Sequence, residues 1–138
     1  MVFLNLLFIL NRSYLRIYFF SSMSDNIFYV YLLRCWKTKE GFQRHRPLYG
    51  NIIYTGQTNN IYRRLIEHTN GKSRYTSQFH GKIRIAYLEH YDTRSEAFIR
   101  ESEIKTFSRD KKIKMIYDFK ESHSDVLEHI TTNLRKLL

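Results

Sequence analysis

A segment that changes from strand-like to helix-like within a few residues constrains the fold of this chain more than any other feature. The triplet Tyr54-Thr55-Gly56 ends a short β-branched run that begins at Ile52, and the segment NNIYRRLIEH follows from Asn59 to His68. Asparagine is a favoured helix N-cap, so Asn59 or Asn60 is expected to start a helix that ends near His68 or Asn70. A strand end and a helix start therefore lie next to each other.

The predicted helix carries a guanidinium and an imidazole on one face. Arg64 and His68 are four residues apart, and side chains at that spacing stack one turn above the other. The neighbouring Arg63 competes for the same role, and Arg64 could instead pair with Glu67 on the helix surface. The spacing to His68 favours Arg64. A strand-end tyrosine beside this pair suits the handling of a phosphodiester.

Hydrophobic periodicity predicts the rest of the sheet. β-branched and aromatic residues from Ile27 to Trp36 predict a buried strand, and alternation predicts another from Lys82 to Tyr91. The polar residues 37–50 are expected to form a long basic loop between the first two strands. The predicted fold class is α+β, a small three-stranded antiparallel sheet flanked by helices in the order β-β-α-β-α-α.

Helices are expected after the third strand. One begins at Thr93 or Ser95, with Glu101 on its surface, and a short basic one begins at Ser108. An amphipathic helix is expected within residues 124–138. The apolar residues at roughly helical spacing in the first of these helices are Phe98, Ile99, Ile104 and Phe107.

Length and charge limit the class of protein. A chain of 138 residues holds one domain plus tails. Its formal net charge of +10 favours a polyanionic partner, either nucleic acid or an anionic membrane surface. The single Cys35 excludes an intrachain disulfide and a cysteine-based zinc site. An inert, buried thiol is expected there, consistent with a reduced, cytoplasmic compartment.

Residues 1–25 form an N-terminal extension whose role the sequence leaves open. Its apolar run precedes Arg12 and Arg16, the reverse of a secretory signal, and polar residues interrupt it before the roughly 18 apolar residues that a membrane span needs. An upstream start codon with Met23 as the true start, a targeting segment and a weak anchor are the three interpretations. The main domain is expected at 26–119 and a C-terminal amphipathic helix at 120–138.

These motifs resemble the GIY-YIG nuclease superfamily, especially its small single-domain bacterial and archaeal members. The first family signature corresponds to Tyr29-Val30-Tyr31 and the second to Tyr54-Thr55-Gly56. The helix arginine of the family corresponds to Arg64, which is followed by His68, and the metal-binding glutamate corresponds to Glu101. The resemblance covers residues 26–117. It departs from the family pattern at Tyr29, where the family has glycine, and at Thr55, where it has isoleucine.

The resemblance implies a metal-dependent endonuclease that hydrolyses DNA, possibly branched or single-stranded, by a single-metal mechanism. It implies that Glu101 holds Mg²⁺ or Mn²⁺, a hard cation that carboxylate, water and phosphate oxygens satisfy. It also implies that Arg64 binds the phosphate and that Tyr31 orients or deprotonates the attacking water. An ordinary tyrosine pKa near 10 is too high for an efficient base, so a shifted pKa or a relay through Tyr54 or His68 is needed.

Two other classes of function stay open at this point. A non-catalytic nucleic-acid-binding module would keep the fold and the basic surface without cleaving its ligand. A membrane-tethered interaction protein would use residues 1–22 as its anchor, although the sequence gives membrane association little support. The site residues expected for the nuclease are Tyr31, Tyr54, Arg64, His68 and Glu101.

Overall fold

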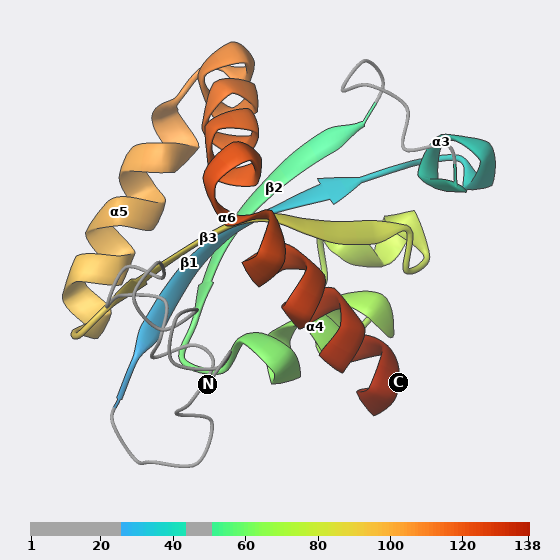
Figure 1. The fold of residues 1–138 in the computed structure, drawn as a ribbon, viewed down its shortest axis with the longest axis horizontal. Coiled ribbons are helices and arrows are strands. Elements are labelled where there is room, and N and C mark those ends of the chain that lie inside the picture. Colours follow the sequence, from blue (N-terminus) through green and yellow to red (C-terminus); the bar gives the residue numbers. More distant parts are fainter. Residues whose placement is uncertain (1–25, 44–50) are drawn as a thin grey trace, which may run out of the picture.

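The computed structural model describes residues 26–43 and 51–138. The predicted N-terminal extension, including the proposed start at Met23, therefore lies outside the described residues, as does the second half of the predicted basic loop. Three strands and four α-helices follow one another within the described residues (Figure 1).

The three strands form one antiparallel sheet, as predicted. Strands β1 (Phe28–Cys35), β2 (Ile52–Thr58) and β3 (Ile83–Tyr91) are arranged in the order β2-β1-β3. In this register Tyr31 lies opposite Gly56, and Leu33 lies opposite Tyr54. The two family signatures are therefore side by side on paired strands, with β2 at one edge of the sheet.

Part of the predicted loop is helical. Helix α3 (Lys39–Gln43) occupies five residues after β1. The Thr38 hydroxyl accepts a hydrogen bond from the Gly41 backbone N–H at 3.1 Å, and the ring of Phe42 lies 5.5 Å from that of Trp36 in an edge-to-face contact. Such a short helix, with a glycine at its centre, shows no hydrophobic periodicity in the sequence. The contact of Phe42 with Trp36 is a tertiary contact, which the local sequence does not predict.

The predicted helix starts are confirmed by their capping contacts. Helix α4 (Ile61–Thr69) follows Asn60, whose side chain accepts a hydrogen bond from the Arg63 backbone N–H. Helix α5 (Arg94–Thr106) starts with a capping box between Thr93 and Glu96. A short 3₁₀ helix, η1 (Thr76–Phe79), lies between α4 and β3.

The two helices expected after α5 are joined into one element, α6 (Arg109–Leu137), which bends at His123. The φ and ψ angles of His123, −141° and 33°, are not helical. Ile116 before the bend and Ile130 after it are both buried, but they belong to different apolar clusters. The bend therefore allows one helix to cover both faces of the sheet, and its end reaches α4 (Figure 1).

Alternate residues of β1 supply the two apolar clusters. Val30 and Leu32 pack against α5 and the first half of α6, whereas Tyr31 and Leu33 pack against α4, η1 and the second half of α6. Cys35 is buried in the second cluster, as expected, and burial raises the pKa of its thiol to about 12. No helix in the described part of the chain is long and apolar enough to cross a membrane.

The buried face of α5 agrees with the predicted one at Ile104 but differs from it at Phe98, Ile99 and Glu101. Phe98 and Ile99 are 58% and 65% exposed, and the side chains that face the sheet are those of Ala97, Glu101 and Ile104. Small Ala97 allows close approach to the strands, so this contact, not the largest apolar residues, sets the rotation of the helix. Glu101 consequently points inward, where the prediction had it on the surface.

Candidate active site

A buried hydrogen-bonded chain connects β1, α4 and η1. The Tyr31 hydroxyl lies 2.8 Å from His68 Nε2, and His68 Nδ1 lies 2.6 Å from the hydroxyl of Thr76. The side chains of all three residues are fully buried. Two neutral tautomers of His68 satisfy these contacts: one accepts from Tyr31 and donates to Thr76, and the other reverses both bonds.

Arg64 joins this chain from the exposed side. Its Nε–H donates to the Tyr31 hydroxyl at 3.3 Å, and its Nη1 lies 2.7 Å from a Glu67 carboxylate oxygen. Arg63 also reaches Glu67, at 2.6 Å, but it points outward with its side chain 55% exposed. Arg64 therefore pairs with Glu67 and contacts Tyr31 at the same time. Arg63 shares the pairing with Glu67, and the contact with Tyr31 distinguishes Arg64 from it.

Tyr54 and Gly56 complete the wall of this cluster on β2. The Tyr54 ring lies 5.1 Å from the His68 ring in an edge-to-face contact and stacks on Tyr75 at 5.7 Å. A Cβ atom added to Gly56 would lie 2.5 Å from the Tyr31 hydroxyl oxygen. Only glycine therefore allows the Tyr31 ring to lie over this edge strand.

The electrostatics of the cluster keep two of its groups uncharged. Burial is the main cause that raises the pKa of Tyr31, and the nearby Tyr54 and Glu101 raise it further against the opposing effect of Arg64. Burial, followed by the Arg64 charge, lowers the pKa of His68 to about 4. At neutral pH the phenol is protonated and the imidazole is neutral.

Glu101 reaches the cluster through its charge. It lies on α5, on the other face of the sheet from Tyr31, yet its carboxylate contributes to the raised pKa of Tyr31. Its direct partner is Lys105, whose Nζ lies 2.8 Å from a carboxylate oxygen. The Glu101 side chain is 12% exposed, whereas that of Lys105 is 56% exposed and can turn away into solvent.

The donor set suits a cation held mostly by water and substrate. No group of three or more histidine, cysteine, aspartate or glutamate side chains within residues 26–43 and 51–138 could hold a metal ion. Mg²⁺ is often bound through one or two carboxylates, with waters and phosphate oxygens as the other ligands. Glu101, a largely buried carboxylate whose charge acts on Tyr31, fits that kind of binding.

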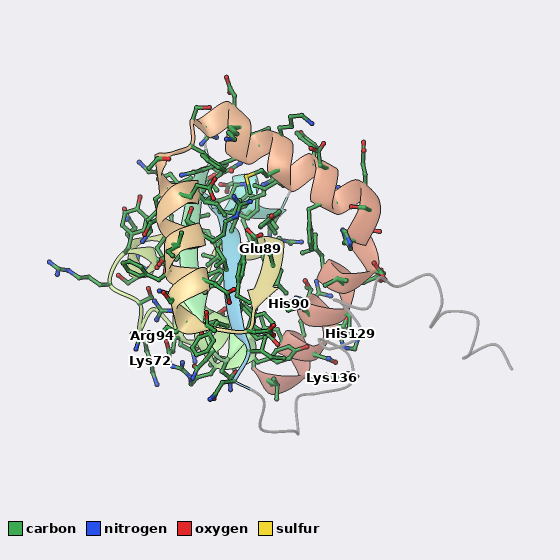
Figure 2. The ribbon with its side chains drawn as sticks, turned by 90° about the vertical axis from the view of Figure 1, so that its left-hand side faces the viewer. Lys72, Glu89, His90, Arg94, His129 and Lys136 are labelled. Atoms are coloured by element: carbon green, nitrogen blue, oxygen red, sulfur yellow. The ribbon has the colours of Figure 1, made fainter. Side chains whose placement is uncertain are left out.

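An open, basic pocket of about 400 Å³ adjoins this cluster. Arg94, which is labelled in Figure 2, lines it from the start of α5, and Arg64 lines it from α4. Arg64 connects the pocket with the Tyr31 hydroxyl, because it lines the pocket and donates to that hydroxyl. The residues that line it are Phe28, Gln57, Thr58, Asn59, Arg63, Arg64 and Arg94.

The structure brings Tyr31, Tyr54, Arg64 and His68 into contact and places Glu101 within electrostatic range. Sequence reasoning missed Thr76, Tyr75 and Arg94. Thr76 and Tyr75 lie in the polar stretch after α4, which has no periodicity. Only the polar, non-repetitive character of that stretch, typical of functional loops, was a signal.

Comparison with known proteins agrees with this fold. The model of the GIY-YIG catalytic domain matches residues 27–114. A UPF0213 protein of Staphylococcus saprophyticus is 39% identical over 88 residues, which cover 64% of this chain and 92% of the relative. A UPF0213 protein of Staphylococcus haemolyticus is 38% identical over the same share of each chain. No solved structure gives a significant match.

The fold and the paired tyrosine motifs define a small α+β domain of the nuclease type. The chain belongs to the GIY-YIG family, as the resemblance predicted. A UPF0213 protein of Staphylococcus aureus is 36% identical over 64 residues, which cover 46% of this chain and 78% of the relative. Members of the family generally use divalent metal ions and act on nucleic acid.

Proposed function

We propose that this protein is a metal-dependent endonuclease that hydrolyses DNA phosphodiester bonds in the cytoplasm. The observation that carries the proposal is the connection from Arg64 through the Tyr31 hydroxyl to His68, at a sheet edge beside a pocket lined by three arginines. Family membership supports the class of reaction. Residues 26–119 are proposed as the nuclease domain.

The electrostatics favour an orienting role for Tyr31 over a role as the base. A phenol whose pKa lies above its ordinary value keeps its proton at neutral pH, and the neighbouring imidazole is a weak base. The Tyr31 oxygen accepts a bond from Arg64, so the hydroxyl is held in one place by a charged donor. In our proposal it positions the attacking water, and the contacts of His68 with Tyr31 and Thr76 keep it there.

Arg64 is the proposed phosphate ligand. Its planar fork binds two oxygens of a phosphate, which lysine cannot imitate, and its side chain is 27% exposed at the pocket. Glu101 is the proposed ligand of Mg²⁺ or Mn²⁺, an ion that neutralises phosphate charge and lowers the pKa of bound water. Arg63 and Arg94 would bind the phosphates on either side of the scissile one.

The proposal is tested by cleavage assays on purified protein with supercoiled, nicked, flapped and branched DNA, with and without Mg²⁺ or Mn²⁺. Cleavage that requires the ion is expected. Arg64→Ala should lower the rate by at least about 100-fold, because it removes a charged group at the reacting phosphate. Arg74→Ala is the control, since it removes the same charge from an exposed position that does not line the pocket.

A second matched pair tests the carboxylate. Glu101→Gln should abolish the ion-dependent cleavage, whereas Glu103→Gln, which loses only a surface pairing with Arg100, should not. Equal effects of the two variants would contradict the role proposed for Glu101.

A non-catalytic nucleic-acid-binding module is the second candidate function. The observation that favours it is the ion pair between Glu101 and Lys105, which occupies the only carboxylate proposed for the metal. Binding of DNA that weakens with salt, without cleavage under either ion, would select this candidate.

A further inference from the structure

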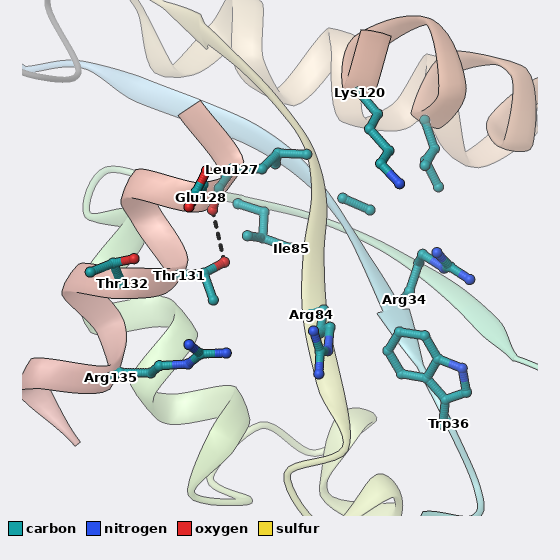
Figure 3. Close-up of a pocket in the computed structure, with 12 residues that line it drawn as sticks. Arg34, Trp36, Arg84, Ile85, Lys120, Leu127, Glu128, Thr131, Thr132 and Arg135 are labelled. Carbon is teal, nitrogen blue, oxygen red and sulfur yellow. Dashed lines mark hydrogen bonds between the residues drawn. The ribbon is translucent and has the colours of Figure 1, made fainter. Parts of the chain in front are cut away.

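A second pocket, of about 380 Å³, is separate from the pocket beside the Tyr31 cluster and is shown in Figure 3. It lies beside β3, between the two halves of α6, with Lys120 before the bend and Arg135 after it. Four cationic side chains line it, and they face a single carboxylate, that of Glu128. The four are Arg34, Arg84, Lys120 and Arg135.

The fold places two of these cations directly opposite each other. Arg34 on β1 and Arg84 on β3 are cross-strand partners, an arrangement that is destabilising for like charges. Each guanidinium lies over an aromatic ring: Arg34 is 5.0 Å from the centre of the Trp36 ring, and Arg84 is 4.7 Å from that of Phe42. The rings hold the two cations in place, but they do not neutralise them.

Two hydrogen-bond donors of this pocket are buried without an acceptor. They are Nε1 of Trp36 and Nε of Arg84. Buried polar groups in native proteins nearly always have partners, and both of these groups can only donate. Burial, followed by the charge of Arg135, lowers the pKa of Arg84. An anionic acceptor in the pocket would satisfy both donors and would also offset the excess of positive charge around it.

We propose that this pocket binds a phosphate group of a nucleic-acid strand, at a site separate from the Tyr31 cluster. Guanidinium forks match phosphate oxygens, and the volume lies at the lower end of the range for small-ligand sites, which suits a single nucleotide unit. The choice of a strand as the source of the phosphate rests on the proposed function and on the net charge of +10.

The position of the pocket restricts the shape of the substrate. Both sites use β1, but Tyr31 and Arg34 alternate along that strand and point to opposite faces of the sheet. A nucleic acid bound at both sites must bend around the sheet. A flexible single strand or a branched molecule does so readily, whereas a short duplex resists bending.

Trp36 provides a direct readout, because it is the only tryptophan of the chain and lines the pocket. A short single-stranded oligonucleotide is titrated into the wild-type protein with a metal chelator, which prevents cleavage. Tryptophan emission and the anisotropy of the labelled strand are recorded together. A saturable change of the emission is expected at the concentrations at which the strand binds.

A matched pair of variants tests the pocket itself. Arg135→Ala should weaken the emission response about 3- to 10-fold, because it removes one phosphate contact. Lys136, labelled in Figure 2 near the end of α6, is the next residue and does not line the pocket. Lys136→Ala removes the same charge and should have a much smaller effect. Lys120→Ala, also an exposed position, provides a second test with little risk to the fold.

Three outcomes would overturn the inference: strand binding with unchanged emission, equal weakening by Arg135→Ala and Lys136→Ala, or an equal emission response to a free mononucleotide. The last would make the pocket a site for free nucleotides instead of a strand. Cleavage assays on the same preparations separate the two proposals. An emission response without cleavage refutes the nuclease proposal alone, and cleavage without the response refutes this one alone.

Discussion

His68 Nε2 lies 2.8 Å from the hydroxyl of Tyr31, a residue 37 positions away in the sequence. Both side chains are buried, and burial moves their pKa values in opposite directions, up for the phenol and down for the imidazole. The pair is therefore uncharged over a wide range of pH. This property connects the stability of the domain with the chemistry proposed for it.

The stability of the domain should fall as the pH is lowered through the range set by His68. The pKa of His68 is about 4 in the folded protein and about 6.5 in an unfolded chain, so below about pH 6.5 the unfolded state binds the extra proton. The loss is complete below pH 4 and amounts to a free energy of unfolding on the order of 3 kcal/mol. Urea denaturation at a series of pH values measures it.

A histidine-to-asparagine pair provides the control for this pH dependence. His68→Asn should remove most of the slope between pH 6.5 and 4, whatever its effect on stability at neutral pH. His80→Asn replaces an exposed histidine in the left-handed conformation, which asparagine tolerates, and should keep the slope. An unchanged slope in His68→Asn would contradict the assignment.

Tyr31→Phe should lower the cleavage rate by about 100-fold or more, the usual range for a positioned proton-handling group. Because Tyr31 is proposed to orient water and not to take up its proton, the shape of the pH–rate profile should stay the same. Steady-state cleavage rates across the pH range test both parts. Tyr29→Phe, on the same face of β1, is the control. If one limb of the pH–rate profile disappears in Tyr31→Phe but not in Tyr29→Phe, Tyr31 is the base and the orienting role is wrong.

Gly56→Ala should separate activity from folding. The added methyl group would lie 2.5 Å and 2.6 Å from Oη and Cζ of Tyr31 and 2.9 Å from Cε1 of Tyr54, so both rings must move. Overpacking of this kind costs about 1–3 kcal/mol of stability, but cleavage should fall by at least about 100-fold, since a small misplacement of reacting groups has large effects. Circular dichroism and cleavage assays on one preparation give the two values, and near-normal cleavage would show that the exact place of the Tyr31 ring is unimportant.

The sequence predicted those features that local pattern determines. Runs of β-branched and aromatic residues located the first two strands, and alternation located the third. Capping residues located the helix starts, and the four-residue spacing placed Arg64 and His68 on one face of α4. The contact between His68 and Thr76 was not predictable, because it closes a turn that has no repeating pattern. The pairing of Arg34 with Arg84 depends on strand register, which is known only once the sheet has formed.

The error at α5 has a different physical cause. Helical spacing indicated Phe98 and Ile99 as the buried side chains, but Ala97 and Glu101 face the sheet. Ala97 is too small and Glu101 too polar to give an apolar signal in the sequence. Close packing nevertheless favours Ala97 on this face, and the proposed metal role requires Glu101 there. A carboxylate on a buried face removes the apolar periodicity by which pattern analysis would recognise that face.

Thr55→Val should stabilise the domain by about 1 kcal/mol. The Thr55 hydroxyl is buried without a hydrogen-bond partner, and an apolar group of the same shape removes its desolvation penalty. Thr58→Val on the same strand is the matched control: its hydroxyl contacts the backbone of Asn60, so the change should be destabilising. Urea denaturation of both variants gives the comparison, and a destabilised Thr55→Val would mean that its hydroxyl has a partner in solution.

Lys105→Ala should lower the concentration of Mg²⁺ or Mn²⁺ needed for half-maximal cleavage. The ammonium lies 2.8 Å from the Glu101 carboxylate and competes with a divalent ion for the same oxygens. Because Lys105 is more than half exposed, the pairing is weak, and a change of about 2- to 5-fold is expected from a surface ion pair. Lys111→Ala, on the neighbouring helix, controls for the loss of general positive charge. Calorimetric titration of the ion measures the same affinity without DNA, and an unchanged or weaker affinity in Lys105→Ala would show that the ion does not bind at Glu101.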